Sequence, residues 1–223
     1  MIDTAALKSR ILEQAFRGNI TKRYTDDENA RILYTKLVNN NKISHIESVE
    51  ELYEIPETWK WISLGNVGKW GAGATPSRKV KDYYGGDIPW LKTGDLNDGM
   101  ITDIPEYITE LALKETSVKL NPVGSVLIAM YGATIGKLGI LEVEATTNQA
   151  CCACSTYEGI YNKYLFYYLM SQRDRLRYMG SGGAQSNISK EKIVGYCFPL
   201  APYAEQIRVV NAIETIFAEL DKI

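Results

Sequence analysis

Residues 199–223, PLAPYAEQIRVVNAIETIFAELDKI, carry the strongest periodic pattern in the chain. The apolar residues recur at steps of four, three, four and three, which is the spacing of the a and d positions of a coiled coil. These residues are Val209, Ile213, Ile216, Leu220 and Ile223. Pro199 and Pro202 mark the start of the pattern. We therefore predict a helix over Ala204–Ile223, in a C-terminal coiled-coil segment at residues 201–223, whose apolar seam needs a partner helix.

The other end of the chain offers such a partner. Residues 5–17, AALKSRILEQAFR, place Leu7 and Ile11 on one helical stripe and stop at Gly18-Asn19, a pair typical of a helix C-cap. We expect this N-terminal helix segment (1–21), or a second copy of the chain, to cover the C-terminal seam. A second helix is predicted over Asp26–Val38, within a helical linker at residues 22–54.

Between residues 55 and 200 the pattern changes to short apolar segments separated by Gly and Pro. Strands are predicted at 59–64, 88–91, 125–131, 137–143 and 150–155. Helical spacing is clearest over Asn162–Tyr178, which is followed by a glycine-rich stretch. The fold class is therefore α+β, with a β-rich mixed domain at 55–200 between terminal helices. Trp59, Trp61 and Trp90 lie in strand-like contexts and are expected in its core.

Composition and rare residues narrow the classes of function. The chain has 223 residues with 25 Lys and Arg against 27 Asp and Glu, so nucleic-acid binding would have to rest on local basic clusters. The only histidine, His45, lies in a polar stretch, which disfavours Ser–His or Cys–His catalysis. Cys151, Cys152 and Cys154 lack zinc-site spacing, and we expect them to be buried, reduced thiols in a strand. We expect no metal and no cofactor.

The N-terminal sequence has no signal-peptide pattern, and no uncharged stretch is long and continuous enough to span a membrane. We therefore expect a cytoplasmic protein that does not enter a membrane.

Four stretches, taken in order, resemble the specificity (S) subunit of type I restriction-modification systems. They are IPETWKWISLGNVG with GAGATPSR, then YYGGDIPWLKTGDL, then TTNQA, and finally GSGGAQSNISKEKI leading into residues 199–223. In front of them, AALKSRILEQAFRGNIT resembles the end of the family's spacer helix, and DDENARILYTKL resembles the short helix that follows it. The resemblance covers essentially the whole chain.

The resemblance implies a subunit without a catalytic centre that reads double-stranded DNA and positions methyltransferase and restriction subunits. The residues agree, because the chain lacks a methylase motif, a complete phosphate-binding loop and a paired acidic nuclease signature. Family members of full length carry two target-recognition domains, whereas this chain has one and resembles half a subunit. We expect two copies to pair through their terminal helices as a two-fold dimer with a palindromic target.

Docking of the methyltransferase is expected on the helical stem rather than on the β-rich domain. Once the seam is buried, Glu205, Arg208 and Glu214 are expected on exposed faces of the C-terminal helix, where they can contact this partner.

Three polar stretches of the domain are candidates for DNA contact. The loop TPSRK with Lys81 suits phosphate contact, and Arg78 can form a bidentate pair with guanine; a solvated loop is the alternative. The glycine-rich stretch 180–189 supplies Ser, Gln and Asn, of which Gln or Asn can pair with adenine; a plain connector is the alternative. In TGDLN, 93–97, turn formation is favoured over base reading. The candidate residues are Thr75, Ser77, Arg78, Lys79, Lys81, Thr93, Asn97, Ser181, Gln185, Ser186 and Asn187.

Two alternatives stay open. Arg173, Arg175 and Arg177 either follow DNA phosphates or favour the negative pole of the helix that they end. A different class of function is a coiled-coil adaptor whose β-rich domain binds protein or glycan, which the acidic charge balance and the aromatic content support.

Overall fold

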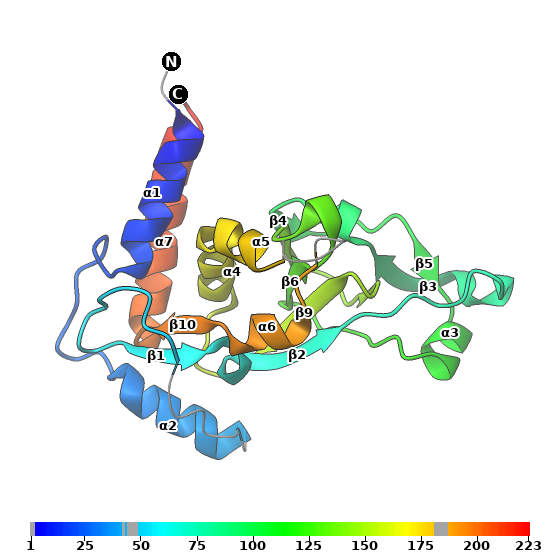
Figure 1. Ribbon diagram of the computed structural model, residues 1–223, viewed down its shortest axis with the longest axis horizontal. Coiled ribbons are helices and arrows are strands. Elements are labelled where there is room, and N and C mark those ends of the chain that lie inside the picture. Colours follow the sequence, from blue (N-terminus) through cyan, green and yellow to red (C-terminus); the bar gives the residue numbers. More distant parts are fainter. Residues whose placement is uncertain (1–2, 42, 44–48, 181–186) are drawn as a thin grey trace. The chain divides into compact units, whose positions relative to one another are not determined.

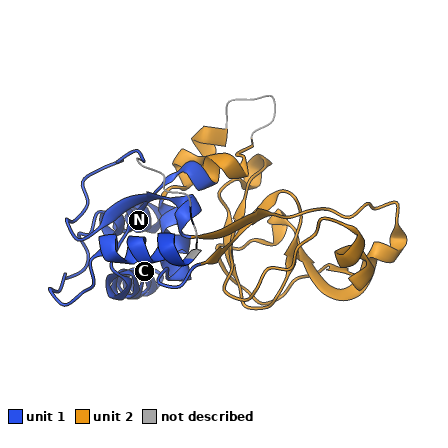
Figure 2. Cartoon of the chain, turned by 90° about the horizontal axis from the view of Figure 1, so that it is seen from below, with its two compact units in different colours: residues 1–67, 157–171, 194–223 blue, residues 68–156, 172–193 orange. Residues whose placement is uncertain are grey.

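A computed structural model describes residues 3–41, 43, 49–180 and 187–223. The chain forms two compact units, coloured separately in Figure 2. Unit 1 combines residues 1–67, 157–171 and 194–223, and unit 2 combines residues 68–156 and 172–193. The fold is of the α+β class, and no helix in the described part of the chain is long and apolar enough to cross a membrane.

Unit 1 contains most of the helices. Its elements are α1 (Thr4–Phe16), α2 (Ala30–Asn41), β1 (Lys60–Ser63), the short 3-10 helix η1 (Leu64–Asn66), α4 (Asn162–Ser171), β10 (Cys197–Leu200) and α7 (Tyr203–Leu220). β1 and β10 pair antiparallel, with Lys60 opposite Leu200 and Ser63 opposite Cys197. This ladder joins segments from the two ends of the chain.

α1 and α7 lie side by side and run antiparallel (Figure 1). Lys8, near the start of α1, forms an ion pair with Asp221 just after α7, and its ammonium lies 5.1 Å from the centre of the Phe217 ring. Val209 and Ile213 of the apolar seam are fully buried. α1 therefore packs against α7 within a single chain, which agrees with the first of the two expected coverings for this part of the seam.

The seam is covered less well towards the free end of the helix pair. α7 ends at Leu220, short of the predicted Ile223, whose exposed fraction is 75%. Ile11, Ile216 and Leu220 are half-buried, and Leu7 is exposed. Apolar surface therefore remains at this end of the stem.

Three charged residues expected on exposed faces of α7 have partners inside unit 1. Glu205 is fully buried, and its carboxylate accepts hydrogen bonds from Trp59 Nε1 at 2.9 Å and from Thr21 Oγ1 at 3.2 Å. Arg208 forms an ion pair with Asp27, and Glu214 forms one with Lys163 at 2.8 Å. The expectation that these side chains lie on exposed faces was wrong for Glu205, whereas Arg208 and Glu214 are half-buried and pair with Asp27 and with Lys163 of α4.

Unit 2 contains most of the strands. Its elements are β2 (Gly68–Ala72), η2 (Lys81–Tyr83), β3 (Tyr84–Leu91), η3 (Thr93–Asp95), β4 (Gly99–Ile101), β5 (Tyr107–Ile108), α3 (Glu110–Glu115), β6 (Val126–Ala129), η4 (Gly132–Thr134), β7 (Leu138–Leu141), β8 (Thr146–Thr147), β9 (Cys151–Thr156) and α5 (Arg173–Gly180). α6 (Lys190–Gly195) contains the last crossing between the units.

Two sheets build unit 2. The larger sheet has the order β2-β9-β6-β7-β4, and the smaller has the order β5-β3-β8. β9 pairs on both sides, and the side chains of Cys151, Cys152 and Cys154 are fully buried there as free thiols. Burial raises the pKa of Cys152 to about 12, so its thiol stays protonated at neutral pH. This confirms the prediction of buried thiols in a strand.

The five predicted strands are present as β1, β3, β6, β7 and β9, and Trp59, Trp61 and Trp90 are buried as predicted. Two helix predictions need correction. The second helix begins at Ala30 rather than Asp26, because the Asn29 side chain accepts from Arg31 N at 2.9 Å and caps it. The helix predicted over Asn162–Tyr178 is two helices, α4 and α5, separated at the buried Gln172.

Candidate nucleic-acid interface

The basic loop (residues 75–81), which follows β2 and ends at the first residue of η2, presents all five of its predicted contact residues at the surface of unit 2. These are Thr75, Ser77, Arg78, Lys79 and Lys81, and each is exposed. Thr75 Oγ1 hydrogen-bonds the side chain of Gln149, which anchors the start of the loop. The loop therefore places two hydroxyls and three cations in one short stretch, a combination suited to phosphate contact.

Two aromatic residues of β3 donate hydrogen bonds to backbone carbonyls at the start of this loop. Tyr84 OH donates to the Pro76 carbonyl at 2.6 Å, and Trp90 Nε1 donates to the Ala74 carbonyl at 3.0 Å. The Arg78 guanidinium lies 4.1 Å from the centre of the Tyr84 ring and 5.2 Å from that of Trp90, within the range of cation–π attraction. The Arg78 side chain is therefore held against the aromatic rings of Tyr84 and Trp90.

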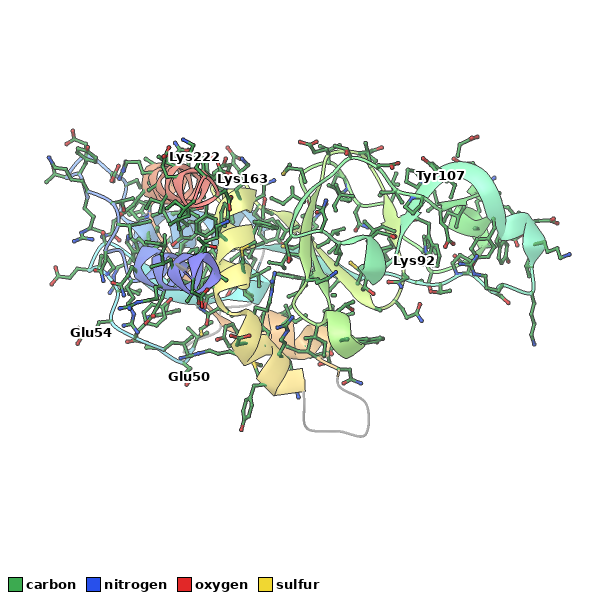
Figure 3. The ribbon with its side chains drawn as sticks, turned by 90° about the horizontal axis from the view of Figure 1, so that it is seen from above. Glu50, Glu54, Lys92, Tyr107, Lys163 and Lys222 are labelled. Atoms are coloured by element: carbon green, nitrogen blue, oxygen red, sulfur yellow. The ribbon has the colours of Figure 1, made fainter. Side chains whose placement is uncertain are left out.

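Glu106 completes this cluster and was missed by the sequence analysis. Its Oε2 accepts from Arg78 Nη2 at 2.7 Å, and its Oε1 accepts from Lys92 Nζ. These hydrogen bonds, first from Lys92 and then from Arg78, lower the pKa of Glu106, so the group is ionised at neutral pH. Figure 3 labels Lys92 and Tyr107, the residue that follows Glu106.

The position of Glu106 results from strand pairing rather than from local sequence. Trp90 N donates to the Glu106 carbonyl at 2.8 Å, beside the ladder in which Pro89 of β3 lies opposite Tyr107 of β5. No spacing in the sequence links Glu106 to Arg78, which precedes it by 28 residues. Only the register of β3 with β5 could have revealed the cluster.

The loop 93–97 has the hydrogen bonds of a turn. Asp95 Oδ2 accepts from Lys92 N at 2.8 Å, and Asn97 Oδ1 accepts from Gly99 N at 2.9 Å while its Nδ2 donates to the Met100 carbonyl at 3.3 Å. Thr93 is half-buried in the short helix η3. These contacts agree with the turn interpretation, and base reading by Thr93 or Asn97 stays a prediction.

Of the glycine-rich candidates, Ser181, Gln185 and Ser186 lie outside the described residues. Asn187 is exposed, and its backbone N donates to the Gly180 carbonyl at 3.0 Å, which brings the two flanks of the stretch together. Asn187 also forms an isolated β-bridge with Tyr131, an exposed residue two positions after β6. Residues 172–193 carry five Lys and Arg against two Asp and Glu, so this part of unit 2 is locally basic.

The arginines of α5 make specific contacts with the turn between β6 and β7. Arg173 Nε donates to the Gly136 carbonyl at 2.9 Å, and its Nη2 forms an ion pair with Asp98 at 2.5 Å. Arg177 Nε donates to the Ile135 carbonyl at 3.1 Å. Arg173 begins α5 rather than ending a long helix, so the negative-pole interpretation was wrong for it. These two side chains hold α5 on the sheet.

A metal site would require several ligands close together. Within residues 3–41, 49–180 and 187–223, no group of three His, Cys, Asp or Glu side chains is placed to hold a metal ion.

Known proteins are similar to this chain both in sequence and in fold. The family model described as the type I restriction modification DNA specificity domain matches residues 56–222. The specificity subunit of the type I restriction enzyme EcoR124I/EcoR124II from Escherichia coli is 32% identical over 161 residues, 70% of this chain and 40% of that protein. The MjaIX specificity subunit from Methanocaldococcus jannaschii is 34% identical over 139 residues, 60% of this chain and 32% of that protein.

The fold has a solved counterpart. The crystal structure of the HsdS subunit from Thermoanaerobacter tengcongensis aligns with a TM-score of 0.61 at 21% identity, and the alignment covers 98% of this chain and 50% of that one. The chain thus spans half or less of the length of these relatives. Because the family model matches most of the chain, this protein belongs to the family of type I restriction-modification DNA specificity subunits.

Proposed function

We propose that this chain is a non-catalytic DNA-recognition subunit of a type I restriction-modification complex, with unit 2 as its target-recognition domain. The family match over residues 56–222 carries the proposal, since the matched model is that of a DNA specificity domain. The surface chemistry of unit 2 supports it, because the exposed cations of the basic loop can neutralise phosphates. The partners proposed are double-stranded DNA, a methyltransferase subunit and a restriction subunit.

Within this proposal, Lys79, Lys81 and Ser77 contact the DNA backbone, and Arg78 faces base edges. We assign these different roles because the lysines and Arg78 have different surroundings. For Lys79 and Lys81 no ion pair is described, whereas Arg78 is held by Glu106 and by two aromatic rings. An ordered side chain favours sequence-dependent contact, whereas a mobile ammonium suits the uniform charge of the backbone. The glycine-rich candidates Ser181, Gln185, Ser186 and Asn187 form the second proposed contact region.

We also propose that two copies associate through the free end of the helical stem. Leu7 and Ile223 are exposed there, and Ile216 and Leu220 are only half-buried by α1. A second copy would cover these residues, and two copies together would supply the two recognition domains of a longer relative. A two-fold dimer predicts a palindromic target with two identical half-sites.

A mobility-shift assay with a random duplex library tests the proposal. The chain is mixed with its methyltransferase subunit at low and at moderate salt, and bound DNA is sequenced. We expect a selected motif and binding that weakens steeply with salt, because phosphate contacts release counterions. Absence of DNA binding in the assembled complex at both salt concentrations would contradict the proposal and favour the adaptor function, with a protein or glycan ligand.

A further inference from the structure

Three charged side chains form a row on the surface of unit 2, with the carboxylate of Glu106 in the middle. Arg78 donates to one of its oxygens and Lys92 donates to the other, so the carboxylate bridges the two cations. The exposed fractions of the side chains are 57% for Arg78, 39% for Lys92 and 30% for Glu106. A ligand approaching this face would therefore meet a donor, an acceptor and a second donor in sequence.

The row retains unused hydrogen-bonding capacity. An ionised carboxylate has about four acceptor positions, of which Arg78 and Lys92 use one each. Lys92 has three N–H donors and Arg78 has five, and the described contacts use one of each. A guanine bound by the remaining donors of Arg78 would set its acceptors close to the negative charge of Glu106, which disfavours this contact.

A phosphate is a poor ligand for this row. The carboxylate would face the phosphate at short range and would repel it, and it already neutralises one of the two cations. Phosphate binding would be served better by Arg78 and Lys92 without Glu106. The presence of an ionised acceptor between them favours a ligand that donates a hydrogen bond at its centre.

The major-groove edge of an adenine·thymine pair has this pattern. Adenine N7 is an acceptor, its N6 amino group is a donor, and thymine O4 is an acceptor. A guanine·cytosine pair instead presents two neighbouring acceptors followed by a donor, which would place an acceptor against the central carboxylate. The order of groups on the protein therefore distinguishes the two kinds of base pair.

We propose that Glu106 is a specificity-determining residue that accepts the N6 amino group of an adenine, while Arg78 and Lys92 donate to the acceptors on either side. This inference rests on the proposed function, because it assigns a role within DNA recognition by unit 2. It gives the recognised half-site an adenine·thymine pair at the position that Glu106 contacts.

The test compares two single substitutions in the full chain assembled with its methyltransferase subunit. Glu106→Ala removes the central acceptor. Glu115→Ala is the matched control, because Glu115 is an exposed carboxylate of the same unit that hydrogen-bonds only Tyr83 among the described contacts, at 3.0 Å. Both substitutions remove one negative charge, so both should strengthen non-specific DNA binding to a similar extent. Each complex selects sites from a random duplex library.

With wild-type protein and with Glu115→Ala we expect the same motif, including one adenine·thymine position in each half-site. With Glu106→Ala the preference for that pair should fall by about tenfold, and guanine should become tolerated because no carboxylate would then face its O6 acceptor. The other positions of the motif should not change. Lys92→Ala, which removes a flanking donor and keeps the carboxylate, should weaken the preference at the same position.

The outcomes distinguish a failure of the proposed function from a failure of the role proposed for Glu106. If the wild-type complex selects no motif, the proposed function fails and this inference fails with it. If the wild-type complex selects a motif that neither Glu106→Ala nor Lys92→Ala alters, the proposed function stands and the role of Glu106 is wrong. Should Glu106→Ala lower the melting temperature and fail to assemble, Lys92→Ala alone decides, since its ammonium contacts only Glu106 in the described structure.

Discussion

Arg78 and Lys79 are neighbours in the sequence, but their surroundings differ. The guanidinium of Arg78 stacks on Tyr84 and pairs with Glu106, whereas Lys79 is exposed and contacts its loop through a backbone N–H that donates to Ser77 Oγ at 3.4 Å. A held side chain loses little further freedom when it meets a ligand, and it presents its donors in a fixed direction. The two residues therefore should contribute differently to DNA recognition.

Alanine substitutions at these two positions should separate specificity from affinity. We expect Arg78→Ala to reduce the preference at one base position of each half-site by about 1–3 kcal/mol. Lys79→Ala should weaken binding almost equally for all sequences and lower the salt dependence by about one phosphate contact. Titration of matched and mismatched duplexes at several salt concentrations measures both effects. Unchanged affinity and motif in both variants would place the DNA elsewhere.

Glu205 should contribute to stability rather than to partner binding, because it is fully buried. Glu205→Ala would leave the Trp59 Nε1 donor without its acceptor, and we expect the free energy of unfolding to fall by about 1–3 kcal/mol. Glu219→Ala is the control, since Glu219 is an exposed residue of the same helix and pairs only with Lys222 at 2.6 Å among the described contacts. Urea denaturation compares them, and equal midpoints would contradict the role of Glu205.

At the scale of elements, periodicity identified the terminal helices, and short apolar runs identified the strands β1, β3, β6, β7 and β9. Both patterns arise within a short stretch of sequence, because an element that buries one face carries apolar residues at regular spacing. The break between α4 and α5 was not predictable in this way, because Arg173 is held by Gly136 and Asp98, which are distant in the sequence. The cluster of Glu106 with Arg78 and Lys92 was not predictable for the same reason, because it depends on the register of β3 with β5. Long-range polar contacts leave no periodic signal.

The stem offers a test of association at this scale. We expect Leu220→Asp to shift the chain from dimer to monomer with little change in melting temperature, because Leu220 lies half-buried at the open end of the α1–α7 pair. Ile213→Asp should instead lower the melting temperature strongly, because Ile213 is fully buried within the chain. Light scattering and thermal unfolding measure the two effects. A wild-type chain that remains monomeric at high concentration would rule out the dimer.

At the scale of the whole molecule, we expect the methyltransferase subunit to dock on residues that the chain's own packing leaves exposed. On α7 these include Ala204, Asn211, Thr215 and Ala218, which recur on one side of the helix. Removing α7 altogether is a poor test, because Val209, Val210 and Ile213 belong to the buried core of unit 1. A substitution on the exposed side keeps the fold intact.

We expect Thr215→Arg to prevent co-elution of the chain with its methyltransferase subunit, because a long cation would replace a small side chain on the proposed docking face. Thr35→Arg on α2 is the matched control. Both threonines are exposed, and each donates its hydroxyl to the carbonyl four residues earlier, at 2.8 Å for Thr215 and 3.0 Å for Thr35. Size-exclusion chromatography measures the complex. Normal assembly of Thr215→Arg would move the docking surface away from this side of α7.

The chain crosses between its two units four times, and this connectivity affects what a single backbone cut can do. A protease that cleaves between Val67 and Gly68 produces the pieces 1–67 and 68–223, yet β1 of the first piece is paired with β10 of the second, and α1 lies against α7. The nicked protein should therefore show two bands on a denaturing gel while its native mass stays that of the intact chain.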